Sequence, residues 1–235
     1  MRSCARWLPS PCNISAMSHE HGKTPAKDEQ FDEAFWDERY SARPERWAGK
    51  PHVHLVSETA DLKPGSALDV GTGEGADAIW LAERGWQVTA VDISSVALDR
   101  GRAQANRTSP DVAGRIEWVH ADLTDWVPPP ASFDLVSAHN FHLPSQQRLP
   151  TYQHLFESVA SGGVLLIVGH HPSDLDTTAR RLPDPDPLFT ADELVDELGE
   201  GWTIVAADTR PRTERNRSGE SITVHDAVLV ARRKD

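Results

Sequence analysis

The chain has 235 residues, 38% of them hydrophobic and 26% charged, a composition typical of one folded domain with a substantial core. Its 36 acidic residues outnumber its 24 lysines and arginines, and the net charge of −12 disfavours a nucleic-acid backbone as a general partner. Its apolar runs are too short for a membrane span or a signal peptide, so we expect a cytoplasmic protein without a membrane partner.

The first segment, residues 1–28, contains both cysteines, Cys4 and Cys12, and becomes strongly polar after Met17. The absence of further cysteines excludes a disulfide framework, a thiolate metal site and a cysteine nucleophile in the rest of the chain. We expect residues 1–28 to be a disordered extension and residues 29–235 to form one domain. Translation starts at Met1 or at Met17, and the sequence does not decide between them.

Residues 31–40 place aromatic side chains four positions apart, among them Trp36 and Tyr40, which predicts a short helix with an aromatic stripe. A loop with prolines and glycine follows, and a second helix is expected over about residues 52–62. We expect the aromatic helix to cover a ligand cleft, although ordinary packing against a sheet would produce the same stripe.

Strands and helices alternate after Gly65, which predicts parallel βαβ units in a doubly wound, Rossmann-like α/β domain. The expected strands cover residues 67–70, 87–91, 116–119, 133–138, 163–168, 202–207 and 223–231. The expected helices cover residues 76–84, 94–106, 146–160 and 190–198, the last opened by a capping box at Thr190. A polar loop with Ser218 and Gly219 indicates that the last strand returns antiparallel.

A glycine-rich turn, Gly71-Thr72-Gly73-Glu74-Gly75, joins the first of these strands to a helix. Glycines permit a tight turn and let the backbone approach a ligand closely. Asp92 closes the second strand 21 residues after Gly71, where a carboxylate can accept hydrogen bonds from ribose hydroxyls. Together these features predict a nucleoside-containing ligand; a structural turn without a ligand is the alternative.

The nature of the ligand needs further argument, because Gly71-x-Gly73-x-x-Ala76 also satisfies a relaxed dinucleotide pattern. Asp69 precedes the turn, where its charge would oppose a pyrophosphate but suits a sulfonium or ammonium group. Asp122 follows the third strand and is placed to accept from an adenine amino group. The chain has no Tyr-x-x-x-Lys pair. These features favour an adenosyl sulfonium over NAD.

The stretch ALDVGTGEGADAIWLAERGWQVTAVDIS resembles the cofactor signature of class I S-adenosylmethionine (SAM)-dependent methyltransferases. It is especially similar to the small-molecule branch that includes tellurite-resistance and thiopurine methyltransferase-like proteins. The likeness continues through FDLVSAHNFHL and SGGVLLIV, so it covers roughly residues 31–231. It implies a seven-stranded, mostly parallel sheet with an antiparallel last strand, and SAM as the methyl donor.

The resemblance also implies roles for individual residues. The glycine turn would lie against methionine and ribose, Asp92 would hold the ribose hydroxyls, and Ile93 would pack against the adenine. The full set implied in cofactor binding is Trp36, Tyr40, Asp69, Gly71, Thr72, Gly73, Glu74, Gly75, Asp92, Ile93, Asp122, Leu123, His139 and Asn140. No Asn-Pro-Pro-Tyr-like sequence follows the fourth strand, which disfavours methylation of exocyclic amino groups on nucleic acid.

Four histidines follow the fourth and fifth strands, at the edge where open α/β sheets bind ligands: His139, His142, His170 and His171. His142 is our preferred general base and His139 the second catalytic candidate, whereas His170 and His171 are tentative acceptor contacts. Polar loop residues that only shape the pocket would give the same pattern. The spacing of these histidines and Asp174 matches no standard metal site, so we expect no metal.

An arginine cluster lies in the loop expected between the last two strands, and it includes Arg210 and Arg212. These side chains are placed to attract an anionic acceptor, or else they form a solvated loop that balances an acidic protein.

The sequence thus predicts an enzyme, a SAM-dependent methyltransferase acting on oxygen, nitrogen or sulfur of a small molecule. A SAM-binding protein without turnover is the alternative, followed by an NAD-dependent oxidoreductase. The acceptor, the need for a general base and the oligomeric state are not predicted.

Overall fold

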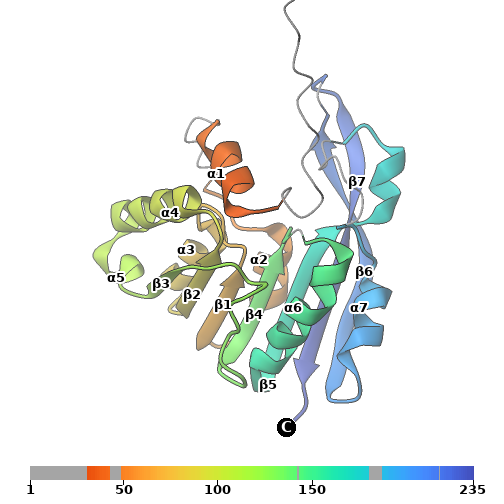
Figure 1. Ribbon diagram of the computed structural model, residues 1–235. Coiled ribbons are helices and arrows are strands. Elements are labelled where there is room, and N and C mark those ends of the chain that lie inside the picture. Colours follow the sequence, from red (N-terminus) through yellow and green to blue (C-terminus); the bar gives the residue numbers. More distant parts are fainter. Residues whose placement is uncertain (1–30, 43–48, 142, 180–186, 217) are drawn as a thin grey trace, which may run out of the picture.

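The computed structural model describes residues 31–42, 49–141, 143–179, 187–216 and 218–235, which form a seven-stranded sheet covered by helices (Figure 1). The strand order is β3-β2-β1-β4-β5-β7-β6. The strands are β1 (Ser66–Val70), β2 (Gln87–Asp92), β3 (Ile116–His120), β4 (Phe133–His139), β5 (Val159–His170), β6 (Trp202–Arg215) and β7 (Ser221–Arg233). The first five pair in parallel, and β7 pairs antiparallel with β5 and β6. The predicted fold class is confirmed.

Helices cover both faces of the sheet. They are α1 (Glu33–Ser41), α2 (Val53–Thr59), α3 (Ala76–Glu83), α4 (Ser95–Thr108), α5 (Pro110–Ala113), α6 (Ser145–Ser158) and α7 (Ala191–Leu198), with a 3-10 helix, η2 (Pro172–Asp176). None of the helices in the described parts of the chain is both long and apolar enough to cross a membrane. The core side chains of α6 and α7 pack on one face, and those of α2, α3, α4 and α5 pack on the other.

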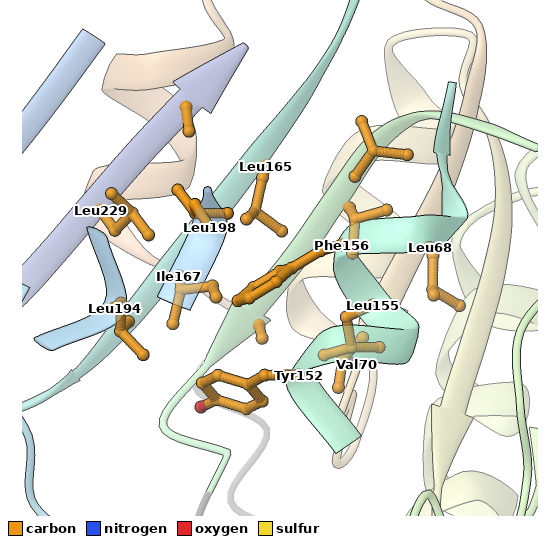
Figure 2. Packing of buried hydrophobic residues seen from close by; sticks show 14 of the residues in the cluster. Leu68, Val70, Tyr152, Leu155, Phe156, Leu165, Ile167, Leu194, Leu198 and Leu229 are labelled. Atoms are coloured by element: carbon orange, nitrogen blue, oxygen red, sulfur yellow. The ribbon is translucent and has the colours of Figure 1, made fainter. Parts of the chain in front are cut away.

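The central strands are apolar on both faces because each face carries its own core. In β5, Leu165 and Ile167 belong to the α6 and α7 side, whereas Leu166 belongs to the opposite side. Figure 2 shows Tyr152 and Phe156 of α6 over this sheet face. Alternation of side chains between two buried faces is what a central parallel strand requires.

Local signals fix several helix starts. The Ser94 side chain accepts a hydrogen bond from the Ala97 N–H and caps α4. The predicted capping box of α7 is present, with Thr190 and Glu193 each bonded to the backbone of the other. The Ser94 cap places the first turn of α4 directly after β2.

The largest difference from the expected elements lies in the last two strands. Residues 202–207 and 223–231 were expected as strands, but β6 and β7 pair from Trp202↔Arg233 to Arg215↔Ser221, with one register shift between Ile204 and Ala206. Beyond the His170↔Asp226 pair, no third strand of the described residues pairs with the hairpin, and only the β6–β7 ladder continues. The expected loop around Arg210 and Arg212 is therefore strand. The second helix is shorter than predicted, α5 and η2 were not predicted, and the prediction for residues 1–28 lies outside the described residues.

Candidate active site

The glycine turn leaves β1 and enters α3 at the carboxyl edge of the sheet. Gly71 and Gly73 have φ values of 65° and 55°, in the left-handed region that favours glycine. A Cβ atom on Gly73 would lie 2.7 Å from the Tyr40 hydroxyl of α1. Gly75 has a different neighbour, because a Cβ atom there would lie 2.3 Å from the Trp118 ring of β3. The lack of a side chain at Gly73 thus leaves room for Tyr40 of the aromatic helix, and the lack of a side chain at Gly75 leaves room for the Trp118 ring.

Asp92 lies where β2 ends, and its residue exposure is only 7%. One carboxylate oxygen accepts from the Gly73 N–H at 2.7 Å, and the other accepts from the Ser94 N–H at 2.8 Å. Burial raises the pKa of Asp92 despite these two hydrogen bonds. The carboxylate therefore ties the glycine turn to β2 and presents its remaining lone pairs at the cavity described next.

A partly open cavity lies above the ends of β1, β2 and β4. Its described lining is mostly apolar and aromatic, with a few acceptors, as is usual for small-molecule sites. The lining residues are Phe31, Trp36, Tyr40, Gly71, Asp92, Ile93, Ala121, Asp122, Leu123, Asn140, Phe141 and Leu143. The structure thus brings together eight of the predicted cofactor residues: Trp36, Tyr40, Gly71, Asp92, Ile93, Asp122, Leu123 and Asn140.

Asn140 supplies an acceptor without a partner. Its φ of 53° is unusual for a residue other than glycine, and its buried Oδ1 has no hydrogen-bond partner among the described residues. A buried acceptor that lines a cavity is costly unless a ligand or a water donates to it. An adenosyl ligand, which carries hydroxyl and amino donors, fits this feature and the free lone pairs of Asp92.

The aromatic helix α1 is anchored over this cavity from α4. Asp37 accepts from the Ser94 hydroxyl at 2.5 Å and from the Val96 N–H at 3.2 Å. Arg100 of α4 donates to the Tyr40 carbonyl at 3.0 Å and also pairs with Glu74. The predicted position of the helix over the cleft agrees with these contacts, whereas Glu74 engages Arg100 and does not line the cavity.

Behind the glycine turn lies a cluster of acids and histidines. Asp69 of β1 accepts from the Thr72 hydroxyl at 2.5 Å, and Asp77 of α3 lies 2.8 Å from Nδ1 of His139. One ligand atom from each of Asp69, Asp77 and His139 lies within 4.8 Å of the others, close enough to surround a positive charge. Burial and the neighbouring Asp77 raise the pKa of Asp69 to about 7. The cluster therefore has acceptor capacity for a cationic group.

The other predicted residues lie along β5, β6 and β7. The Nδ1 atom of His171 accepts from the Ser173 N–H at 3.1 Å, so that this histidine caps η2. His170 ends β5, and neither histidine appears among the described residues that line the cavity. His142, the preferred general base, lies outside the described residues.

Both arginines predicted to contact the acceptor are engaged by acids. Arg210 lies 2.6 Å from Glu58 of α2 and 3.1 Å from Asp208. Arg212 donates through Nε to both oxygens of Asp226, at 2.9 and 2.8 Å. Asp226 is fully buried, so this pair compensates a charge inside the protein.

Two residues of the acid and histidine cluster, Asp77 and His52, were not singled out by the sequence. Asp77 stands in the first turn of α3, where an acid is already explained by the helix dipole. His52 caps α2, and its ring stacks on His139 with centroids 4.8 Å apart. The only local signal was the proximity of Asp77 to the glycine turn.

Comparison with known proteins shows which domains and structures this chain resembles. Residues 67–163 match the family described as methyltransferase domain. A release factor glutamine methyltransferase from Rhodopirellula baltica is 31% identical over 176 residues, which cover 69% of this chain and 56% of that protein. The chain therefore spans little more than half of that relative's length.

Solved structures extend the likeness over the fold. A structure reported for the conversion of a disulfide bond into a thioacetal group during echinomycin biosynthesis has a TM-score of 0.68, 26% identity, and coverage of 86% of this chain and 91% of that one. TehB from Haemophilus influenzae has a TM-score of 0.64, 18% identity, and coverage of 84% and 67%. NodS from Bradyrhizobium japonicum, an N-methyltransferase in complex with S-adenosylhomocysteine, has the same score and identity, and coverage of 84% and 96%.

Proposed function

We propose that this chain, a class I SAM-dependent methyltransferase by its matching domain and its fold, transfers a methyl group from SAM to a small-molecule acceptor. The observation that carries the proposal is the cavity beyond β1, β2 and β4, where a buried carboxylate and an unpartnered amide oxygen meet an aromatic wall. Ligands bind at this place in open α/β sheets, where the strand order reverses. The acceptor atom is oxygen, nitrogen or sulfur.

The residues present fit an adenosyl sulfonium. Asp92 would accept from ribose hydroxyls, Ile93 and Leu123 would pack against adenine, and Asp122 would accept from the adenine amino group. Asp69 would face the cationic methionine end, and its charge would oppose the pyrophosphate of NAD. When bound, SAM supplies an electrophilic methyl group on a positively charged sulfur.

A small acceptor is favoured over a nucleic acid or a protein. The net charge of −12 opposes a polyphosphate, and the segment after β4 reads His139-Asn140-Phe141 where an Asn-Pro-Pro-Tyr-like sequence would indicate exocyclic amino groups. Trp36 and Tyr40 of the aromatic helix α1 also line the cavity, and exclusion of water by these rings would favour methyl transfer to a small nucleophile. The name of the release factor glutamine methyltransferase indicates a protein as its acceptor. A protein acceptor is therefore the competing outcome of the assay below.

The residues assigned to the acceptor remain proposals. His139 is the described candidate for a general base, and His142 is the candidate outside the described residues. His170, His171, Arg210 and Arg212 are candidate acceptor contacts, although the two arginines would have to leave their acidic partners to bind an anion.

The test is a methyl-transfer assay with isotopically labelled SAM against phenols, thiols, amines, oxyanions, a peptide mixture and RNA. We expect label in at least one small molecule and none in RNA or peptide. Label confined to peptide or RNA would contradict the assigned acceptor class. Binding of S-adenosylhomocysteine without any transfer would make the chain a SAM-binding protein without turnover.

Cofactor selectivity is checked separately by thermal unfolding. A ligand that binds only the folded state raises the melting temperature. We expect S-adenosylhomocysteine to raise it and NAD to leave it unchanged, and the reverse order would support an oxidoreductase.

A further inference from the structure

His139 is held in a defined orientation at the end of β4. Its side chain is only 5% exposed, and its Nδ1 lies 2.8 Å from Oδ2 of Asp77. The other carboxylate oxygen of Asp77, Oδ1, accepts from the backbone N–H of His52 at 2.6 Å. Each oxygen of Asp77 therefore has its own partner, one on β4 and one at the start of α2.

The His52 ring completes this arrangement. It stacks on the His139 ring with an interplanar angle of 3° and centroids 4.8 Å apart. Burial, and next the adjacent His139, lower the pKa of His52 to about 4, so this ring is neutral at physiological pH. The other titratable groups near the pair are Asp69 of β1, Asp226 of β7 and His54 of α2. Two neutral rings can lie face to face, whereas two imidazolium rings would repel each other.

Asp77 is ionised in the same setting. Burial alone would raise the pKa of Asp77, but the contacts with His139 and His52 lower it. A carboxylate can only accept hydrogen bonds, so the proton of a neutral His139 must stand on Nδ1. The Nε2 atom is then a bare acceptor. Both ring nitrogens are buried and make no well-aligned hydrogen bond to the described residues, so the Nδ1 contact with Asp77 rests on the ion-pair distance of 2.8 Å.

We propose that Asp77 and His52 are positioning residues that hold His139 as the Nδ1–H tautomer, so that Nε2 removes a proton from a neutral O–H, N–H or S–H acceptor. This inference rests on the proposed function and narrows it to acceptors that arrive with a proton on the reacting atom. In the transfer, the acceptor atom forms a bond to the methyl carbon as the sulfur–methyl bond breaks. The acceptor proton passes to Nε2, and the resulting imidazolium faces the Asp77 carboxylate until it releases the proton to solvent.

Asp77→Asn is the most direct test of this tautomer, because the hydrogen bond from the His52 N–H determines the orientation of the new amide group. Its carbonyl oxygen must keep accepting from the His52 N–H, so its NH₂ group faces Nδ1 of His139. That donor requires a bare Nδ1 and moves the proton of His139 to Nε2, where it blocks proton removal. The variant thus reverses the tautomer while it preserves size and both contacts.

The tautomer is measured by long-range ¹H–¹⁵N NMR on the full chain with labelled histidine, with and without S-adenosylhomocysteine, and the His139 signals are assigned by their loss in His139→Gln. We expect Nδ1–H in the wild type and Nε2–H in Asp77→Asn. Asp111→Asn, which removes an equal charge from an exposed ion pair, is the matched control and should leave the tautomer unchanged.

A structural role for Asp77 alone would not move the tautomer. A wild-type Nε2–H signal, or an unchanged tautomer in Asp77→Asn, would overturn the inference and leave the proposed function standing. If the wild type did not bind S-adenosylhomocysteine, that result would instead contradict the proposed function.

The chemical consequence is tested on a thiol series of graded acidity. Asp77→Asn should slow transfer to weakly acidic thiols about 100-fold or more, the usual contribution of a positioned base, and should spare thiols that are already ionised. An equal loss for both kinds of thiol would contradict proton removal by His139.

Discussion

Two polar regions lie along the carboxyl edge of the sheet, and they differ in how their groups are satisfied. Around β1, β2 and β4, a cavity is lined by Asp92, Asp122 and the Asn140 amide oxygen, which has no hydrogen-bond partner among the described residues. Asp92 and Asp122 accept hydrogen bonds from neighbouring backbone N–H groups, but no opposite charge neutralises them in the contacts described. Along β6 and β7, charged groups face opposite charges, as in the pair of Arg212 with the buried Asp226. The first region therefore keeps acceptor capacity at a cavity, whereas the charges of the second are neutralised by the protein.

The comparison predicts that the hairpin pair matters for stability and not for the cofactor. Arg212→Leu leaves Asp226 buried without its guanidinium partner, which should cost about 3 kcal/mol of unfolding free energy. Chemical denaturation measures this loss, and calorimetry should show unchanged affinity for S-adenosylhomocysteine. Burial raises the pKa of Asp226, but the contacts with His54 and Arg212 lower it below its ordinary value. These contacts therefore stabilise the wild type at pH values above the pKa of Asp226 in the unfolded chain, and this stabilisation is lost as the pH falls through the lowered pKa of the folded protein. The difference between wild type and variant should therefore shrink in acid.

The glycine turn can be compared with the hairpin turn through two alanine substitutions. Gly75→Ala puts a Cβ atom against Trp118 and should destabilise the fold by about 2 kcal/mol more than Gly219→Ala. Both glycines have positive φ, 78° and 86°, but a Cβ atom on Gly219 has no described neighbour within 4 Å. Equal losses on denaturation would show that backbone strain, and not the Trp118 contact, requires the glycine.

Asp69 should make cofactor binding depend on pH. Because burial and Asp77 raise its pKa to about 7, Asp69 is mostly protonated at pH 6 and mostly ionised at pH 8. The affinity for SAM, whose sulfonium charge is permanent, should rise about tenfold over this range, since the ionised carboxylate attracts the cation. Asp69→Asn should flatten the profile, and a wild-type affinity that falls with pH would contradict the placement of the cation.

The smallest effect is expected at Arg210. Its guanidinium is engaged by Glu58 and Asp208, so Arg210→Ala should change the apparent KM for the acceptor by less than about twofold, within the range of surface pairs. A larger rise in KM would show that Arg210 leaves these acids to bind an anionic acceptor. The hairpin and the cavity would then contact the same ligand.

The sequence allowed prediction of the sheet and of several residues that line the cavity, because both depend on local patterns. A buried strand, a glycine turn and an acid at the end of the next strand are each visible within a few residues, as Gly71 and Asp92 show. The alternation of strands and helices also predicts parallel pairing, which the structure has for β1 to β5.

The rest depends on contacts between distant segments. The extension of β6 from Ala207 to Arg215 was missed because Pro211 and the alternating charges around it are typical of a loop, although Pro211 lies on the edge strand β6, where the ladder tolerates proline. The role of Asp77 arises only when α2 and β4 bring His52 and His139 to its two oxygens.

The central claim is that the cavity beside Asp92 binds the adenosyl group of SAM. Calorimetric titration of S-adenosylhomocysteine into the wild type and Asp92→Asn tests it directly, with Asp99→Asn, an exposed acid of α4, as the control. We predict one site per chain in the wild type and the control, and an affinity at least about 30-fold lower in Asp92→Asn because hydrogen bonds to a charged acceptor are lost. Equal affinity in all three proteins, or no binding to the wild type, would contradict the account.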